Sequence, residues 1–239
     1  AYTYLYYWKF FANSLSVTAL GVLGNLLSGS MIAYGFSRYT FKGRNLLFLL
    51  VILTVIIPVQ TIIIPMSIQY ADLGWANTLL PLIVPNFFGF GLRGGLYIFV
   101  FRQFFIGLPK ELEEAAQIDG ASQLRIFTSI VIPISKPLLA TISLFLCFGY
   151  WNDWFLSSLY ISKKNLISLQ ALLNNIMRSL EYMTNNPTAG VSLQQYRAQM
   201  PSESVRMAIA IVIVIPIACA YPFFQKYFIS GLTIGAVKG

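Results

Sequence analysis

Long apolar stretches alternate with short charged segments along the chain. Five stretches, of 28, 27, 20, 16 and 19 residues, contain no Asp, Glu, Lys or Arg. About 20 apolar residues in a helix are enough to cross the hydrocarbon core of a bilayer, whereas a soluble fold would have to bury five nearly uncharged helices together. The pattern therefore predicts an all-α membrane protein with five transmembrane helices, at about residues 10–36, 46–70, 79–102, 137–160 and 205–224.

Prolines and glycines interrupt the predicted helices at defined places. Pro58 and Pro65 predict a kink or break in the second span, because proline lacks the N–H of a helical hydrogen bond and its ring crowds the preceding turn. Pro85 and four glycines interrupt the third span. In the first span Gly21 and Gly29 flank Asn25 at spacings of four, which favours close helix packing, and Asn25 is expected to make an interhelical hydrogen bond.

The composition supports a membrane protein and excludes several other classes. Apolar residues make up 57% of the chain and charged residues 10%, and the mean hydropathy of +0.69 lies outside the range of ordinary soluble domains. The net charge of +8 comes from basic residues at the ends of spans, which fits lipid headgroups and not nucleic acid. Cys147 and Cys219 lie in apolar runs and are interpreted as buried thiols. The absence of His excludes His-based triads and removes a common zinc ligand, so no catalytic or metal-binding residue is predicted.

The basic residues also predict how the chain crosses the membrane, because cytoplasmic loops are enriched in Lys and Arg. One side carries nine and the other six, which places loop 102–136 in the cytoplasm and loop 161–205 outside, within a single transmembrane domain over 1–239. Five spans put the first residue outside, and the sequence does not begin with Met, so a sixth, N-terminal helix is expected to precede it. The nine are Arg38, Lys42, Arg44, Arg102, Lys110, Arg125, Lys136, Lys226 and Lys238, and the six are Lys9, Lys163, Lys164, Arg178, Arg197 and Arg206.

Residues 102–136 form the one long segment of mixed polar and apolar character between spans. Pro109 and the acids after it predict a helix start, because proline suits the first turn and acids there face the positive end of the helix dipole. Gly120 ends this helix, since Gly adopts a positive φ at little cost. Ser122 is suited to cap a second helix, which Pro133 is expected to stop. Two short helices joined at a glycine elbow form a protrusion suited to a groove in a partner.

The spacing within this segment resembles the conserved cytoplasmic loop of binding-protein-dependent ABC importer permeases. That loop has Glu-Ala-Ala, three residues, Gly, nine residues and then Ile-x-Leu-Pro. The matching residues here are Glu114, Ala115, Ala116, Gly120, Ile130 and Pro133. Ile132 stands where the family has Leu, an exchange between apolar residues. From the helix pattern alone, the alternative is an amphipathic surface hairpin.

Further motifs narrow the resemblance to carbohydrate-uptake permeases of the maltose-transporter type, to the second permease subunit and to its oligosaccharide branch. They are RQFF at the start of the loop, the Trp151-Asn152 pair and the closing GLTIGAVKG. The resemblance implies a type I importer permease fold of six helices in a bacterial cell membrane, paired with a homologous permease. It also implies two cytoplasmic ATPase subunits that hold ATP and Mg, and an external sugar-binding protein that meets loop 161–205 and delivers an oligosaccharide.

The same resemblance assigns residues to ATPase contact. In the coupling loop they are Glu113, Glu114, Ala115, Ala116, Asp119, Gly120, Ala121 and Pro133, and in the C-terminal tail they are Gly235, Ala236, Val237, Lys238 and Gly239. The chain has no G-x-x-x-x-G-K-[ST] phosphate loop, so it is not expected to bind ATP in that way or to be an enzyme. Closing of the ATPase pair would tilt the protrusion and rock the kinked spans between inward and outward access.

Candidate residues for the substrate pathway come from the third and fourth spans. Nine residues at 1.5 Å each place Arg93 about 13 Å deeper than Arg102, near mid-bilayer, where a charge is costly unless it faces a cavity or a partner. Arg93 therefore either binds sugar, snorkels along broken backbone or pairs with Asp153. The aromatic and polar run around Asp153 either offers the flat faces and hydrogen-bonding groups that a pyranose needs or forms an interfacial belt. The candidates are Arg93, Asn86, Tyr150, Trp151, Asn152, Asp153 and Trp154.

Two other functions stay open at this level. An ion-coupled secondary transporter or channel could use Arg93 and Asp153 as a charge relay, but such carriers place acids well inside their spans and the cytoplasmic protrusion would be unexplained. ATP-dependent uptake that survives collapse of the ion gradients would separate this function from an ATP-driven importer. An intramembrane enzyme is the third function, and no nucleophile–base constellation supports it.

Overall fold

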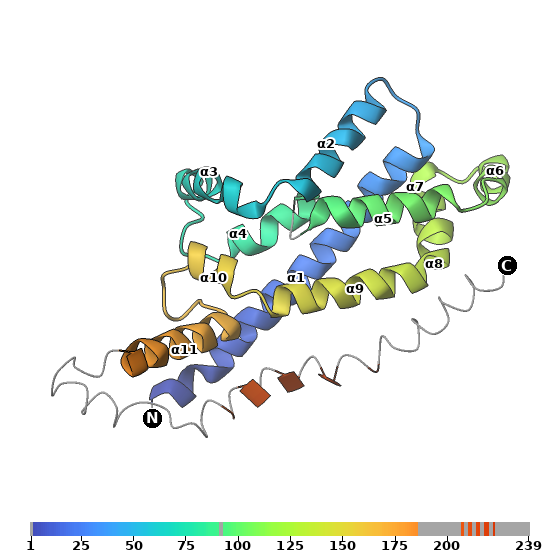
Figure 1. Cartoon of the computed structure of the whole chain (residues 1–239). Helices are drawn as coiled ribbons and strands as arrows, with labels where there is room; N and C mark the ends of the chain where they lie inside the picture. Colours follow the sequence, from blue (N-terminus) through green and yellow to red (C-terminus); the bar gives the residue numbers. More distant parts are fainter. Residues whose placement is uncertain are drawn as a thin grey trace.

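The computed structural model of the chain describes residues 2–90 and 93–185, together with eight single positions between 207 and 222. Every element in the two continuous ranges is helical, from α1 (Tyr2–Arg38) to α11 (Leu169–Asn185). Most of the predicted fifth span and all of residues 235–239 lie outside the described residues. Figure 1 shows α1 as a long diagonal helix, with α5 and α9 beside it.

α1 is the helix around which the others are arranged. Its neighbours along its length are η1 (Val84–Phe88), α5 (Gly94–Ile106) and α9 (Lys136–Trp151). Two glycines permit the close approach, since a Cβ on Gly24 would lie 2.7 Å from the Phe87 ring and one on Gly21 would lie 3.1 Å from the Tyr150 ring. The predicted packing face of the first span is therefore confirmed.

The second predicted span is a pair of helices at nearly a right angle. α2 (Arg44–Ile56) and α3 (Val59–Asp72) are bent by 102° relative to each other. The break falls at Pro58, and Ile57 before it takes the extended conformation that a following proline favours. Pro65 lies inside α3 without ending it. Of the two predicted kink positions, the chain breaks at the first.

The third predicted span is also interrupted, as its proline and glycines indicated. α4 (Leu80–Ile83) runs into η1, and the chain then turns at Gly89, whose φ is 74°. Helical structure resumes at Gly94 with the 13 residues of α5. Glycine takes a left-handed conformation without the steric penalty of a Cβ, which is why the turn can be this tight. The apolar run from 79 to 102 is therefore not one continuous helix.

The coupling segment contains the two short helices that the sequence predicts, joined where Gly120 has a φ of 80°. Its elements are α6 (Glu111–Ile118), α7 (Gln123–Ile126), the π-helical turn η2 (Phe127–Val131) and α8 (Ile132–Ile134). The prediction that Pro133 stops the second helix is wrong. The Ile132 amide reaches back five residues in a π turn, and the helical backbone continues through Pro133 to Ile134. The helix ends at Ile134, and at Ser135 the chain bends by 78° into α9.

The main apolar core lies between the inner part of α1, α5, α9 and the coupling segment. Phe101, Phe105 and Ile126 are completely buried in it. The Tyr34 ring of α1 packs against Phe127 of the coupling segment, with ring centroids 5.0 Å apart. The coupling segment is therefore packed into the core and is not suspended on a loose loop.

α10 (Phe155–Tyr160) and α11 pack around a second apolar cluster at the N-terminal end of α1. α11 lies within residues 161–205, beside the N-terminal part of α1 (Figure 1). Ser14 Oγ accepts a hydrogen bond from the Leu169 amide at 2.8 Å, and the Asn13 side chain donates to the Asn165 carbonyl at 3.1 Å. These two bonds fix the start of α11 to α1.

Within the described residues, Tyr7–Arg38 is long and apolar enough to cross a membrane by itself. Two bent pairs also qualify if each is counted as one span, namely α2 with α3 and the helical stretch 123–134 with α9, which gives up to three. α5 is a shorter apolar helix. The number of five spans stays a prediction.

Candidate coupling surface and translocation path

The coupling segment exposes a face that is both apolar and acidic. Ile118, Leu124 and Leu112 are 86, 64 and 46% exposed, although all three are large apolar residues. Glu114 and Asp119 are exposed on the same segment. We call these five residues the docking face. Apolar side chains rimmed by charge are typical of surfaces that bind another protein.

Local bonds hold α6 and α7 in a fixed relative orientation. Ser122 Oγ accepts a hydrogen bond from the Arg125 amide at 3.4 Å, which confirms Ser122 as the cap of α7. Across Gly120, the Ala121 amide donates to the Ala116 carbonyl at 2.9 Å. Both alanine side chains pack against the main core. The elbow therefore presents the docking face as a defined shape.

Glu113 points away from the docking face and into the protein. Its carboxylate accepts a hydrogen bond from Arg38 Nε at 2.6 Å and another, on the second oxygen, from the Tyr34 hydroxyl at 2.8 Å. Arg38 also donates through Nη2 to the Leu108 carbonyl at 3.1 Å. We call Tyr34, Arg38 and Glu113 the inner joint. The structure thus separates Glu114, which is exposed, from Glu113, which is buried.

Asn86 and Tyr150, two of the predicted pathway residues, meet inside the helix bundle. The Tyr150 hydroxyl donates to Asn86 Oδ1, and the Asn86 side chain donates to the Leu82 carbonyl at 2.8 Å. Ser28 Oγ donates to the Asn86 backbone carbonyl at 2.6 Å. These bonds join η1, α9 and α1 and place a buried amide and a buried hydroxyl side by side, bonded to each other.

The outer part of the predicted pathway run lies beneath α11. Trp151 is buried edge-to-face against an aromatic ring of α1. Asn152 Oδ1 accepts a hydrogen bond from Gln170 Nε2 at 3.1 Å. The Arg178 guanidinium lies 5.3 Å from the centre of the Trp154 ring, within the range of a cation–π contact. The external helix therefore contacts both ends of the run from Asn152 to Trp154.

Arg93 and Asp153 do not meet. Arg93 is exposed, has a left-handed φ of 58° and directly precedes α5. Asp153 Oδ1 instead accepts hydrogen bonds from the Phe155 and Leu156 amides, each at 3.2 Å, and so caps α10. Over the stretch of chain that the structure describes, no ion pair joins Arg93 to Asp153. The charge relay that an ion-coupled carrier would need therefore has no support in the geometry.

Asn25 is buried at the packing face of α1, as its place among small residues indicated. Its exposed fraction is 1%, and neither side-chain polar atom has a hydrogen-bond partner among the described residues. A Cβ on Gly94 would lie 3.9 Å from Asn25 Nδ2, so the start of α5 is close by. The predicted burial is confirmed, and the predicted interhelical hydrogen bond is not found in this part of the chain.

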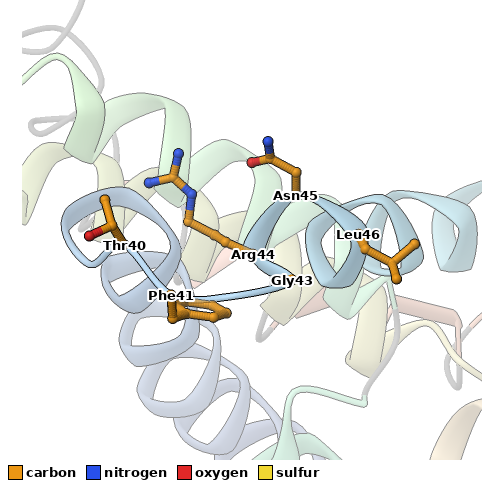
Figure 2. Close-up of a pocket in the computed structure, with 6 residues that line it drawn as sticks. All are labelled: Thr40, Phe41, Gly43, Arg44, Asn45 and Leu46. Atoms are coloured by element: carbon orange, nitrogen blue, oxygen red, sulfur yellow. The ribbon is translucent and has the colours of Figure 1, made fainter.

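A shallow hollow of about 270 Å³ lies at the turn between α1 and α2 (Figure 2). Its lining residues are Thr40, Phe41, Gly43, Arg44, Asn45 and Leu46. Arg44 Nη1 donates to the Tyr39 carbonyl at 3.3 Å, which holds the side chain across the turn. The hollow lies roughly 18 Å along α1 from Ser28, so it is separate from the Asn86–Tyr150 pair.

Comparison with known proteins places this geometry in a family. The model of the binding-protein-dependent transport system inner membrane component matches residues 25–234. Protein LplC of Bacillus subtilis (strain 168) is 33% identical over 100% of this chain and 78% of its own. The arabinooligosaccharides transport system permease protein AraQ of Halalkalibacterium halodurans is 31% identical over 98% of this chain and 75% of its own.

The fold also resembles that of a solved transporter. The crystal structure of a bacterial ABC transporter involved in the import of the acidic polysaccharide alginate matches with a TM-score of 0.77 and 27% identity, over 93% of this chain and 75% of that one. The family match covers the coupling segment as well as Asn86 and Tyr150. The helical fold is that of a type I importer permease, and the chain belongs to the family of binding-protein-dependent transport system inner membrane components.

Proposed function

We propose that this chain is a permease subunit of an ATP-driven importer, that it forms half of the translocation pathway for an oligosaccharide, and that it couples to ATPase subunits through residues 102–136. The observation that carries the proposal is the docking face. It exposes Leu112, Ile118 and Leu124 on a packed protrusion with the Glu-Ala-Ala spacing. Removing large apolar side chains from water lowers the free energy, and contact with an ATPase surface would remove these three from water.

An oligosaccharide is the proposed substrate class. Relatives that align with nearly the whole chain are named for arabinooligosaccharides and galactooligosaccharides, and one is named for polygalacturonan and rhamnogalacturonan. The similar solved transporter imports alginate, also a polysaccharide. The family match covers most of this chain, which supports carrying the sugar class over to it.

The proposed path passes the Asn86–Tyr150 pair and the run above it. Asn86 and Tyr150 offer an amide and a hydroxyl, and the outer residues offer indole faces on which a sugar ring can stack. Opening the path to the outside would require the α11 contacts over Asn152 and Trp154 to be released. Arg93, Trp151 and Asp153 stay in the proposal as neighbouring pathway residues.

The proposed partners supply what this chain lacks. ATP and Mg would be bound by two cytoplasmic ATPase subunits, a homologous permease would form the second half of the path, and an external sugar-binding protein would meet the 161–205 loop. The tail residues Gly235 to Gly239, outside the described residues, are proposed to reach the ATPase pair. The domain limits, 1–239 as one transmembrane domain, belong to the same proposal.

The test is a charge reversal on the docking face in the complete complex. We expect Glu114→Lys to abolish sugar uptake and to release the ATPase subunits, because it places a cation where the partner meets an anion. Glu111→Lys, an exposed position on the same helix outside the motif, is the control and should keep more than about half of the uptake, since a helix-dipole change there is worth only ~1 kcal/mol. Normal uptake and normal ATPase retention in Glu114→Lys would reject the proposal.

A further inference from the structure

The inner joint places a buried charge pair where the coupling segment meets α1. The Arg38 and Glu113 side chains are 8 and 10% exposed. A carboxylate at such a site is costly unless both oxygens are bonded, and here Arg38 and the Tyr34 hydroxyl take one oxygen each. Two residues from the last turns of α1, Tyr34 and Arg38, therefore hold the Glu113 carboxylate, one at each oxygen.

Glu113 differs from the other acids of its segment. Glu114 and Asp119 are exposed on the docking face, so they are available to a partner, whereas the carboxylate of Glu113 is occupied within the chain. Arg38 adds a bond to the Leu108 carbonyl, so the joint also holds the turn that leads into α6. Three parts of the structure, the end of α1, this turn and α6, meet at one ion pair.

Two routes connect the docking face to the helix bundle. The covalent route passes through the π turn η2 and then through the 78° bend at Ser135 before it reaches α9. A π turn and a sharp bend are places where a helix can yield. The second route is the inner joint, which is short, buried and packed against Phe127 and Phe105 through the Tyr34 ring.

We infer that Glu113 is a positioning residue that fastens the coupling segment to the inner end of α1, so that movement of the docking face is passed into α1. The inference rests on the proposed function, because it concerns how an ATPase-driven displacement enters the bundle. It separates the two adjacent acids by role: Glu114 faces the partner, and Glu113 joins the partner's docking site to the longest helix of the described chain.

The experiment compares Glu113→Gln with Glu111→Gln in the complete complex, reconstituted in vesicles with sugar-loaded binding protein. Gln keeps the shape of Glu but leaves Arg38 without a counter-charge. We expect Glu113→Gln to retain its ATPase subunits and to hydrolyse ATP, while sugar transported per ATP falls about tenfold, because an unpaired buried charge shifts the joint to other conformations. The sugar concentration for half-maximal uptake should not change, and Glu111→Gln should behave as wild type.

Two further variants show whether the joint itself is responsible. The double variant Arg38→Gln with Glu113→Gln restores a neutral hydrogen-bonded pair and should recover transport per ATP to within about threefold of wild type. Tyr34→Phe keeps the ring and removes one hydrogen bond, so it tests the joint if Glu113→Gln does not reach the membrane. It should lower transport per ATP by about threefold.

The outcomes separate the inference from the proposed function. Wild-type transport per ATP in both Glu113→Gln and Tyr34→Phe would overturn the inference and leave the proposed function standing. Loss of the ATPase subunits from membrane-inserted Glu113→Gln would also overturn it, because Glu113 would then be a partner contact. Failure of the unmodified complex to couple uptake to ATP hydrolysis would reject the proposed function and the inference with it.

Discussion

Gly24 and Gly35 occupy the same helix but face different surroundings. A Cβ on Gly24 would lie 2.7 Å from the Phe87 ring, whereas nothing lies within 4 Å of the place where a Cβ on Gly35 would be. The first glycine therefore sets the distance between α1 and η1, and η1 carries Asn86. The second has no packing role in the described part of the chain.

A pair of Gly→Ala variants tests this difference. We expect Gly24→Ala to destabilise the protein by about 1–3 kcal/mol, because the Phe87 ring must move away from α1. Gly35→Ala should be neutral or stabilising by up to ~1 kcal/mol, since Ala favours the helix. Thermal unfolding in detergent gives both values, and equal midpoints for the two variants would contradict the packing role of Gly24.

Residue-level chemistry was only partly predictable from the sequence. The sequence offers Asn86 and Tyr150 as pathway candidates, but they are 64 positions apart and their contact is not encoded in any local pattern. Glu113 is similar, since its partner Arg38 lies 75 positions away. A helix period shows that neighbouring acids face different directions, but it does not show which of them finds a cation.

At the scale of elements, the coupling segment depends on one backbone conformation. Gly120 joins α6 to α7 with a φ of 80°, and Gly43 begins α2 with a φ of 83°. No atom lies within 4 Å of a Cβ built on either glycine. Alanine at either position therefore brings the same kind of backbone strain and no clash.

This equality makes Gly43→Ala the control for Gly120→Ala. Each should cost roughly 1–2 kcal/mol of stability, because an L-residue is strained in the left-handed region. We expect Gly120→Ala alone to lower sugar transport per ATP, by about fivefold, because relief of that strain turns the docking face relative to α7. Uptake assays on vesicles measure this, and an equal loss in Gly43→Ala would show that strain and not the elbow is responsible.

Elements were predicted better than the angles between them. Caps and breakers placed the two coupling helices and the break at Pro58, because these signals act within a few residues. The 102° angle at Pro58 has no local signal in the sequence. Pro133 was expected to stop a helix, but after a π turn the helical backbone continues through it, which local rules do not anticipate.

At the scale of the whole described fold, α1 joins two groups of helices. Its C-terminal end holds the coupling segment through Arg38 and Tyr34, and its N-terminal part holds α11 through Asn13 and Ser14. α11 in turn contacts the outer pathway run. The arrangement implies that α11 is positioned by the same helix, α1, that contacts the coupling segment.

Two serines on one turn of α1 test the outer attachment. Ser14 is buried and accepts the Leu169 amide, whereas Ser16 is exposed. Ser14→Ala leaves that amide without its acceptor, a cost of about 1–3 kcal/mol, so hydrogen exchange at the start of α11 should become at least about fivefold faster. Ser16→Ala should leave exchange unchanged. Unaltered exchange in Ser14→Ala would show that α11 is held by its apolar face alone.

The unbroken 37 residues of α1 carry a further thermodynamic consequence. At 1.5 Å per residue the helix is about 55 Å long, and a tilt of ~5° about one end moves the other by roughly 5 Å. Because α1 contacts both α11 and the coupling segment, binding at its two ends is thermodynamically linked. If a ligand at the α11 end changes the affinity for a partner at the coupling segment by some factor, that partner changes the affinity for the ligand by the same factor. Binding of a ligand to the 161–205 loop should therefore change the dissociation constant of the partner that binds the coupling segment.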